Sequence, residues 1–269
     1  KSILIQHAES YRKIRNTFRF ILGNLKDNYK KQEFDKVDYK KLNELEQYIL
    51  HKLFEIDKSV KESLKNYNFH KLYKEILNFC TLDLSSFYFD IRKDVLYCDS
   101  LKSKKRKDCA IVLNIILESL LKWFAPILVF TTEEIYSLIN KSEESIHEHS
   151  FVEVPGNWKN IQLNEKWKKL FKIKQEANIA IEEKRSNKEI GSSLEAELII
   201  TADSNKFNLL EGLDLEEYFI TSKATKFKSK KNEELKIEVN KSKGTKCGRC
   251  WKILDKKCIR CETAVNENL

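Results

Sequence analysis

The sequence of 269 residues has few of the residues that interrupt helices, with only 6 Gly and 2 Pro. Because tight turns depend on these residue types, their scarcity argues against an all-β protein and favours long helices. No apolar run approaches the ~20 residues that a membrane-spanning helix needs, so we expect a soluble chain. Methionine is absent even at position 1, which suggests a fragment of a longer protein or an excised domain.

Basic residues outnumber acidic ones, giving a net charge of +9 and a pI near 9.0. This balance favours nucleic acid as a partner, although the abundance of Lys, Ile and Asn is also typical of an A+T-biased coding sequence. Only 8 of the 50 basic residues are Arg. Clustered guanidinium groups suit phosphate and base contacts better than scattered ammonium groups do. Two such clusters occur, one of Arg12, Arg15 and Arg19 and one of Arg249 and Arg260.

Apolar residues recur every three or four positions through the first half of the chain, which predicts amphipathic helices. In the first helix, which begins near Tyr11, a stripe beside the apolar face carries Arg12, Arg15, Asn16 and Arg19. The same spacing predicts helices at residues 42–66, 68–79, 84–95 and 102–126. Thr131 and Glu134 have the spacing of a capping box, which predicts that one more helix starts there. We therefore predict an antiparallel helical bundle over residues 1–145.

The pattern changes after residue 145. The charged stretch 141–158 contains Pro155-Gly156 and no helical period, which predicts a domain connection, and a further helix is expected at 164–185. Residues 198–200 and 218–220 are β-like runs, and residues 235–239 alternate with period two after a Lys-rich stretch at 223–231. These features predict a connecting helix and a small α+β unit over residues 146–240, followed by a tail at 241–269.

Four of the seven cysteines form two Cys-x-x-Cys pairs separated by seven residues: Cys247, Cys250, Cys258 and Cys261. This spacing lets four thiolates surround one zinc ion tetrahedrally while backbone N–H groups face the sulfurs, and Gly248 fits the turn. A site with four protein ligands has no open position, so the zinc is structural. Since the tail has few apolar residues, we expect it to be disordered without zinc.

Two disulfides or a redox dithiol are the alternative interpretations of these pairs. The three other cysteines, Cys80, Cys98 and Cys109, stand alone in helical patterns and are predicted to be small buried hydrophobes. Isolated thiols in a Lys-rich chain favour a reduced, cytoplasmic location, and the tail lacks the βαβ context of a redox motif.

Trp251 directly follows the second cysteine among several cations. An indole beside guanidinium groups suits stacking on an unpaired base. Alternatively, Trp251 packs over the two Cys-x-x-Cys turns, which form a zinc knuckle, and serves as its small core. His147 and His149 have a metal-like spacing, but in a charged connection we expect two solvated histidines.

Five segments, in order along the chain, resemble bacterial-type isoleucyl-tRNA synthetases. They are residues 9–20, 84–90, 123–136, 190–196 and 246–251. The resemblance implies a mainly α fold, with a helical bundle of the class I synthetase anticodon-binding type, a small α+β unit and a four-cysteine zinc knuckle. Valyl and leucyl enzymes share the helical domain, but the cysteine tail and segment 190–196 point to the isoleucyl branch. The spacer between the cysteine pairs is shorter than the family leads one to expect.

This resemblance implies a parent that ligates isoleucine to tRNA(Ile) with ATP, but the chemistry is not in these residues. The His-x-Gly-His and Lys-Met-Ser-Lys-Ser elements of a class I catalytic domain are absent, so no catalytic residue is assigned and ATP belongs to the missing domain. We expect a monomeric tRNA-recognition fragment that does not bind membranes. Its bundle would hold phosphates of the anticodon stem, and its tail would bind anticodon bases through Arg249, Trp251 and Arg260. A structural module that binds a partner protein and a dithiol oxidoreductase are the rival hypotheses.

Overall fold

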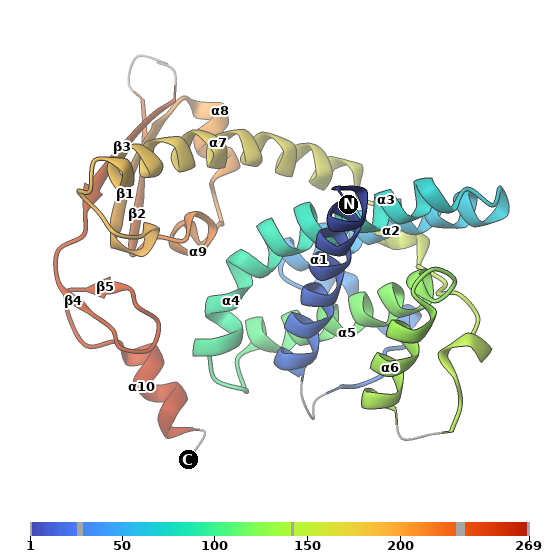
Figure 1. Cartoon of the computed structure of the whole chain (residues 1–269). Helices are drawn as coiled ribbons and strands as arrows, with labels where there is room; N and C mark the ends of the chain where they lie inside the picture. The colour runs from blue at the N-terminus through green and yellow to red at the C-terminus, as the bar shows by residue number, and fades with distance from the viewer. Residues whose placement is uncertain (1, 26–28, 141–142, 230–234, 268–269) are drawn as a thin grey trace. The chain divides into compact units, whose positions relative to one another are not determined.

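The computed structural model describes residues 2–25, 29–140, 143–229 and 235–267, and the chain divides into two compact units (Figure 1). The first unit comprises residues 1–90 and 104–160, and the second comprises residues 91–103 and 161–269. The division falls inside one helix. From the sequence, boundaries were expected near residues 145 and 240, and those three ranges stay a prediction.

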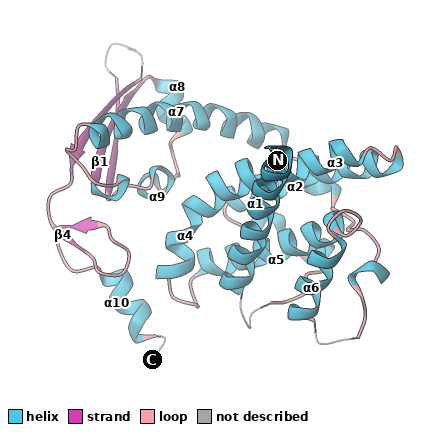
Figure 2. Ribbon diagram, in the orientation of Figure 1, coloured by secondary structure: helices cyan, strands magenta, loops and turns pink. Residues whose placement is uncertain are grey.

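The first unit is built from helices (Figure 2). They are α1 (Ser2–Leu25), α2 (Glu44–Lys65), α3 (Phe69–Asn78), a π-helical segment η4 (Phe79–Tyr88), the start of α4 (Phe89–Cys98), α5 (Lys104–Phe124) and α6 (Val129–Ile139). Short 3-10 turns, η2 (Phe34–Lys36), η3 (Tyr39–Lys41), η5 (Ile146–Glu148) and η6 (Gly156–Trp158), lie in the connections. The predicted helical first half is confirmed.

Burial follows the apolar spacing seen in the sequence. Along α1 the buried side chains include Ile14, Phe18 and Ile21, which share one face of the helix. This face packs on α5, where the Phe18 and Phe124 rings meet edge to face with centroids 6.3 Å apart. Asn68 caps α3 as expected, because its side chain accepts a hydrogen bond from the Lys71 N–H at 3.1 Å.

The capping box expected at Thr131 is wrong. Helix α6 begins at Val129, because the chain already turns where the N–H groups of Ile127 and Leu128 bond to the Phe124 carbonyl. Thr131 therefore lies within the helix, with its hydroxyl 3.0 Å from the Tyr11 hydroxyl.

The expected domain connection also behaves differently from the prediction. Residues 141–142 lie outside the described residues, but residues 143–160 belong to the first unit. Ile146, Val152 and Trp158 are buried, and the Trp158 ring stacks on Phe34 with centroids 5.6 Å apart. Isolated apolar residues can bury themselves without forming a helical period, so periodicity gave no sign of this packing.

The second unit combines a long helix, α7 (Ile161–Ser186), with a small mixed sheet. Strand β1 (Ala196–Ala202) lies centrally, parallel to β2 (Lys223–Lys228) and antiparallel to β3 (Lys236–Lys241). Alternate residues of β1 are buried, including Leu198 and Ile200, as a half-buried strand requires. Helices α7, α8 (Ser204–Leu209) and α9 (Leu215–Phe219) contact this sheet.

One local prediction fails in this unit, and one stretch for which the sequence predicted no structure forms a strand. The strand expected at 218–220 is instead the end of helix α9 and the left-handed residue Ile220 after it, because Asp214 caps α9 and the Tyr218 ring packs edge-on against Trp167. The Lys-rich stretch at 223–231 contains β2, which forms by pairing with β1 although Lys disfavours strands. Lys230 and Lys231 lie outside the described residues.

The end of the second unit surrounds the four clustered cysteines. Strands β4 (Thr245–Lys246) and β5 (Ile253–Leu254) pair, and α10 (Ile259–Asn266) follows. The described chain is thus mainly helical with small sheets and a cysteine cluster, in agreement with the coarse fold prediction. None of its described helices combines the length and apolarity needed to traverse a bilayer.

Candidate nucleic-acid interface and metal site

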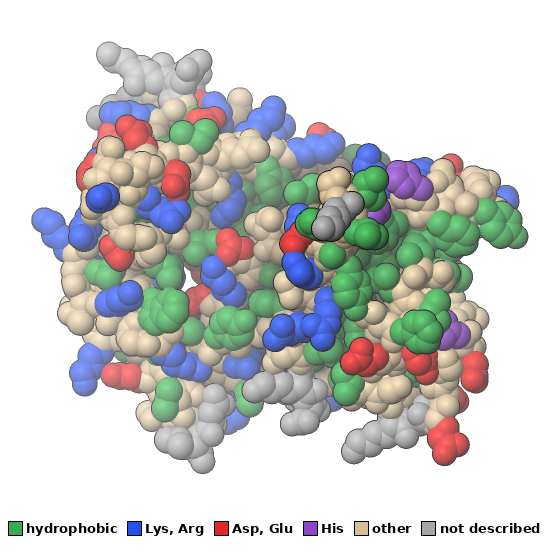
Figure 3. All heavy atoms as spheres, in the orientation of Figure 1, with side chains coloured by type: hydrophobic (Ala, Val, Ile, Leu, Met, Phe, Trp, Pro, Cys, Tyr) green, Lys and Arg blue, Asp and Glu red, His purple; other side chains and the backbone are tan. Residues whose placement is uncertain are grey.

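Helix α1 presents a basic stripe to solvent. Arg12, Arg15, Asn16 and Arg19 are all exposed and occupy positions i, i+3, i+4 and i+7, which lie on one face of a helix. Figure 3 shows Lys and Arg side chains along the side of α1 that faces the viewer. Arg12 forms an ion pair with Glu9, whereas Arg15 and Arg19 have no ion-pair partner in the part of the chain that the structure describes. The guanidinium groups of Arg15 and Arg19 are therefore available to a polyanion.

The two Cys-x-x-Cys pairs converge, as the sequence indicated. The Sγ atoms of Cys247, Cys250, Cys258 and Cys261 all lie within 4.8 Å of one another, and all four cysteines are free of disulfides. A tetrahedral metal site with bonds of ~2.3 Å to sulfur has sulfur–sulfur edges of about 3.8 Å. The Cys250 and Cys258 sulfurs are 3.9 Å apart, far longer than a disulfide bond of ~2.05 Å. The four thiols fit one shared ion.

Backbone N–H groups face the first sulfur of the cluster. Partial burial works to raise the pKa of Cys247, but hydrogen bonds from the N–H groups of Cys250 and Arg249 outweigh it and lower the pKa to about 7. This arrangement favours the thiolate that a metal requires. Gly248 is not sterically required, since a Cβ at this position would meet no atom within 4 Å.

The three remaining cysteines are buried, as predicted. Burial raises the pKa of Cys80 to about 12, so this thiol is inert in the helical core. Cys98, at the end of α4, packs against Cys250 and Cys261. The sequence gave no sign of this position, because a contact between residues so far apart leaves no local pattern.

Trp251 projects from the knuckle rather than filling it. The residue is 59% exposed, and among the described residues 245–267 the buried ones are Cys250, Cys261 and Ala264. The backbone of Trp251 has a φ of 65°, in the left-handed region, and its N–H bonds to the Cys247 carbonyl at 3.0 Å. The Lys246 ammonium lies 5.8 Å from the centre of its ring, within the range of a cation–π interaction. An exposed indole in a strained backbone conformation is a candidate contact for a ligand.

Arg249 and Arg260 have protein partners. The Arg249 guanidinium donates to the Cys98 carbonyl at 2.6 Å and to the Tyr97 carbonyl at 2.9 Å. The Arg260 guanidinium forms a two-pronged pair with Asp94, at 2.6 and 2.9 Å. Although partial burial works to lower the pKa of Arg260, the bonds to Asp94 raise it. The assignment of these two residues to RNA binding stays a prediction.

His147 and His149 do not form a metal site within the described residues, where the cysteines are the one candidate group. They are also not simply solvated. His149 lies 2.6 Å from the Tyr136 hydroxyl, and His147 lies 3.3 Å from the Val129 carbonyl.

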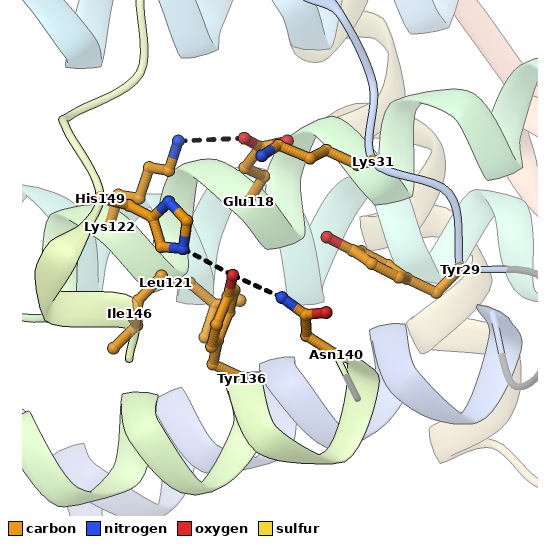
Figure 4. A pocket seen from close by; sticks show the side chains of 9 residues that line it. All are labelled: Tyr29, Lys31, Glu118, Leu121, Lys122, Tyr136, Asn140, Ile146 and His149. Carbon is orange, nitrogen blue, oxygen red and sulfur yellow. Dashed lines mark hydrogen bonds and ion pairs between the residues drawn. The ribbon is translucent and has the colours of Figure 1, made fainter. Parts of the chain in front are cut away.

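His149 and Tyr136 line a small cavity of the first unit, together with Tyr29, Glu118 and Lys122 (Figure 4). Its volume of about 90 Å³ is well below the ~300–1,000 Å³ of common ligand pockets. Burial and the nearby Glu118 raise the pKa of Tyr29 to about 12, so its hydroxyl stays protonated. The cavity offers no room for a nucleotide.

The chain is similar to a known anticodon-binding domain family and to known tRNA ligases. A family model described as the anticodon-binding domain of tRNA ligase matches residues 46–200. The isoleucine–tRNA ligase of Pelagibacter ubique is 55% identical over 259 residues, which cover 96% of this chain and 28% of that protein. The corresponding ligase of Agrobacterium fabrum is 38% identical over 263 residues, covering 94% of this chain and 27% of that protein.

A similar match to the isoleucine–tRNA ligase of Caldanaerobacter subterraneus has 37% identity over 291 residues, covering 99% of this chain and 31% of the relative. The chain thus spans less than a third of the length of these relatives. These relatives are isoleucine–tRNA ligases, which confirms the resemblance to isoleucyl-tRNA synthetases inferred from five segments of the sequence. With the family model matching more than half of its residues, the chain belongs to the anticodon-binding domain family of tRNA ligases.

Proposed function

We propose that this chain recognises the anticodon arm of tRNA(Ile), as part of a protein that ligates isoleucine to tRNA with ATP. The observation that carries the proposal is the exposed stripe of α1, where Arg15 and Arg19 stand in solvent in a chain of the anticodon-binding family. No ligation chemistry is assigned to these residues. The chain supplies binding and orientation, and it acts as a monomer.

The stripe on α1 contacts the phosphates of the anticodon stem. Its members are one turn apart on a rigid helix, so their guanidinium groups form a row that can follow a nucleic-acid backbone. Such contacts fix the position of the RNA without reading its sequence. Asn16, between the arginines, adds an uncharged hydrogen-bonding group to the row.

Trp251 supplies the contact to unpaired bases. Its exposed ring can stack on a base of the anticodon loop, a contact worth ~1–3 kcal/mol per base. Arg249 and Arg260 stay assigned to this recognition, since they flank Trp251 in the same folded segment. Their bonds to α4 point to an indirect role, which the next subsection develops.

One structural zinc ion is held by Cys247, Cys250, Cys258 and Cys261. Four sulfur ligands in tetrahedral proximity are typical of structural zinc sites, and they leave no open position for catalysis. When bound, the ion supplies folding energy to a segment with little apolar core. Elemental analysis should find one zinc per chain, and cobalt substitution should give the spectrum of a tetrahedral tetrathiolate site. Oxidised, cross-linked sulfurs would instead support the redox alternative.

The phosphate contacts are tested by the salt dependence of tRNA binding. Affinity should fall steeply between about 50 mM and about 200 mM salt, because neutralised phosphates release their counterions. Replacing Arg15 with Gln should weaken binding to all tRNAs and reduce the slope of the logarithmic salt plot by ~1. Lys58→Gln, which removes an exposed cation of α2 outside the stripe, is the matched control. An unchanged slope for Arg15→Gln would remove α1 from the interface.

The base contact is tested with two RNAs that differ only in the anticodon loop. Trp251→Ala should weaken binding of the tRNA(Ile) loop by ~5–150-fold, the equivalent of one lost stacking contact, and affect the altered loop less. Phe227→Ala is the control, since this aromatic residue of the same unit is 55% exposed. Equal losses on both RNAs would exclude Trp251 from recognition of the loop.

A protein-interaction module is the second candidate. One observation favours it: Ile259 on α10 is 75% exposed, and Val265 of the same helix is also exposed. In that case tRNA binding would be absent or insensitive to salt.

A further inference from the structure

The C-terminal half of α4 holds the cysteine-bearing tail through an ion pair. Arg260 binds both carboxylate oxygens of Asp94, at 2.6 and 2.9 Å, and lies 3.4 Å from Asp99. A two-pronged guanidinium–carboxylate pair fixes direction as well as distance. Because Arg260 stands between Cys258 and Cys261, this pair fixes the second cysteine pair on α4.

A second tie fixes the first cysteine pair. Arg249, between Cys247 and Cys250, donates to the carbonyls of Tyr97 and Cys98, which are the last two residues of α4. The final carbonyls of a helix lack partners within it and carry partial negative charge, so a guanidinium group is a favourable cap. The Cys98 side chain fills the space between this cap and the cluster, where it packs on Cys250 and Cys261.

Lys252, the residue after Trp251, is also held in place by an ion pair. The Lys252 ammonium lies 3.2 Å from a carboxylate oxygen of Glu216 on α9. The neighbouring Glu217 forms a 2.6 Å ion pair with Arg92 of α4, in which both side chains are largely buried. The backbone on each side of Trp251 is therefore tied, directly or through α9, to the same helix.

Between these ties the indole of Trp251 is exposed to solvent, with the Lys246 ammonium 5.8 Å from its ring centre. Its backbone adopts the left-handed conformation, with a φ of 65°. Stacking on a base depends on the direction of the ring, and a ring held in its binding direction loses less conformational freedom on binding.

We propose that Asp94, Arg260 and Arg249 are positioning residues that hold Trp251 in the direction needed for stacking on an anticodon base. The proposal rests on the proposed function. Arg260 and Arg249 contribute to recognition by binding α4, and Asp94, which carries the wrong charge to touch RNA, contributes through Arg260. We call the contacts of Asp94, Arg260 and Arg249 between α4 and the tail the anchor. Weakening the anchor lowers discrimination between anticodon loops, while zinc binding and the phosphate contacts on α1 stay unchanged.

The test uses Asp94→Asn in the full chain with zinc bound. Removing a negative charge should strengthen RNA binding if electrostatics alone mattered. The anchor instead predicts that affinity for the tRNA(Ile) loop falls by ~5-fold or more, part of the effect of a stacking contact, with little change on the altered loop. The salt slope and one zinc per chain should be retained. Asp94→Glu, which keeps the carboxylate, should restore binding, and Glu262→Gln, at an exposed acid of α10, is the control.

A second readout reports on Trp251 directly. The chain has four tryptophans, and Trp123, Trp158 and Trp167 are fully buried, so the emission that iodide quenches comes from Trp251. In Asp94→Asn and in Arg260→Gln, the anisotropy decay of this emission should gain a fast component that the wild-type chain lacks. This motion is measured without RNA and does not depend on the proposed function.

The outcomes separate the two proposals. If the wild-type chain binds tRNA without salt dependence, the proposed function fails, whereas the anisotropy still tests the anchor. An Arg260→Gln variant that loses affinity while Asp94→Asn and the ring motion stay unchanged would show direct RNA contact by Arg260 and overturn the anchor. Loss of zinc from both variants would also overturn it, because the pair would then be a folding contact of the metal site.

Discussion

The helical first unit and the cysteine-bearing tail keep their shapes by different physical means. In the first unit, α5 alone buries a long series of side chains, among them Leu113, Leu117 and Trp123. In the tail, the buried apolar groups after residue 244 are Cys250, Cys261 and Ala264. Apolar burial contributes ~25 cal/mol per Å², so the first unit can be stable by packing, whereas we expect the tail to depend on the proposed zinc ion and on its ion pairs.

This difference also separates the two recognition surfaces that we propose. On α1 the arginines stand on a helix whose other face is part of the core, so packing positions them. Trp251 has no such packing support, and in our proposal its direction is set by the bonds from Arg249 and Arg260 to α4. A row of charges tolerates small displacements of the RNA, while a stacked ring requires a defined direction. The two surfaces therefore respond to different perturbations.

Metal removal should have the largest effect and should affect the tail alone. Apparent binding free energies of structural zinc in small modules are ~10–16 kcal/mol, so chelation or Cys261→Ser should unfold residues 245–266. Hydrogen exchange read by mass spectrometry should show fast exchange there and unchanged protection in α5. Cys109→Ala, at a buried cysteine of α5, should keep one zinc per chain. Protected tail amides after complete removal of the metal would show that packing holds the tail.

Truncating a side chain in the helical core should have the opposite effect: it should destabilise the first unit and leave the tail unchanged. Phe18→Ala removes a buried ring that packs on Phe124, and it should lower the free energy of unfolding of the first unit by ~3–5 kcal/mol. Chemical denaturation followed by circular dichroism measures the change, and zinc content should not alter. Phe130→Ala is the control, since this residue is 90% exposed and the change should stay within ~0.5 kcal/mol. Loss of zinc in Phe18→Ala would mean that the two regions do not fold independently.

What the sequence could predict follows the same division. Local patterns in the sequence predicted the α1 helix and its arginine stripe, and the spacing of the four cysteines predicted their convergence. Missed features depend on contacts between distant residues. Strand β2 exists because β1 pairs with it, and Asp94 becomes important because Arg260 reaches it across 166 positions. Residue spacing reports on neighbours along the chain, and it contains no information on such partners.

Within the tail, zinc affinity should be more sensitive to a substitution at Gly244, where the backbone conformation is restrictive, than to one at Gly248 between the first two cysteines. Gly244 has a φ of 127°, and a Cβ there would overlap the carbonyl of Leu254 on the paired strand β5. Gly244→Ala should therefore weaken zinc binding by ~1–3 kcal/mol, the usual range for such backbone strain. Competition with a chromophoric chelator measures the affinity. Gly248→Ala lies in the knuckle itself, has open space for a Cβ, and should bind zinc almost as the wild type does. Equal weakening by both variants would show that the tail tolerates no change near its ligands.

The smallest expected effect concerns charge in the helical unit. Burial raises the pKa of Asp83 above its usual value, with the nearby Glu55 acting in the same direction and Lys52 opposing it. A carboxyl whose pKa is raised by folding holds its proton more tightly in the folded state, so its ionisation destabilises the fold. The penalty is absent at a pH below the unfolded pKa, develops as the pH rises through the interval between the two pKa values, and is complete above the folded value. Asp83→Asn should therefore stabilise the first unit at pH 7 by ~0.5 kcal/mol and leave it unchanged at about pH 3. Urea unfolding at both pH values measures the gain, and Asp35→Asn, at an exposed acid, should show none. A gain of equal size at both pH values would place its origin in packing rather than in charge.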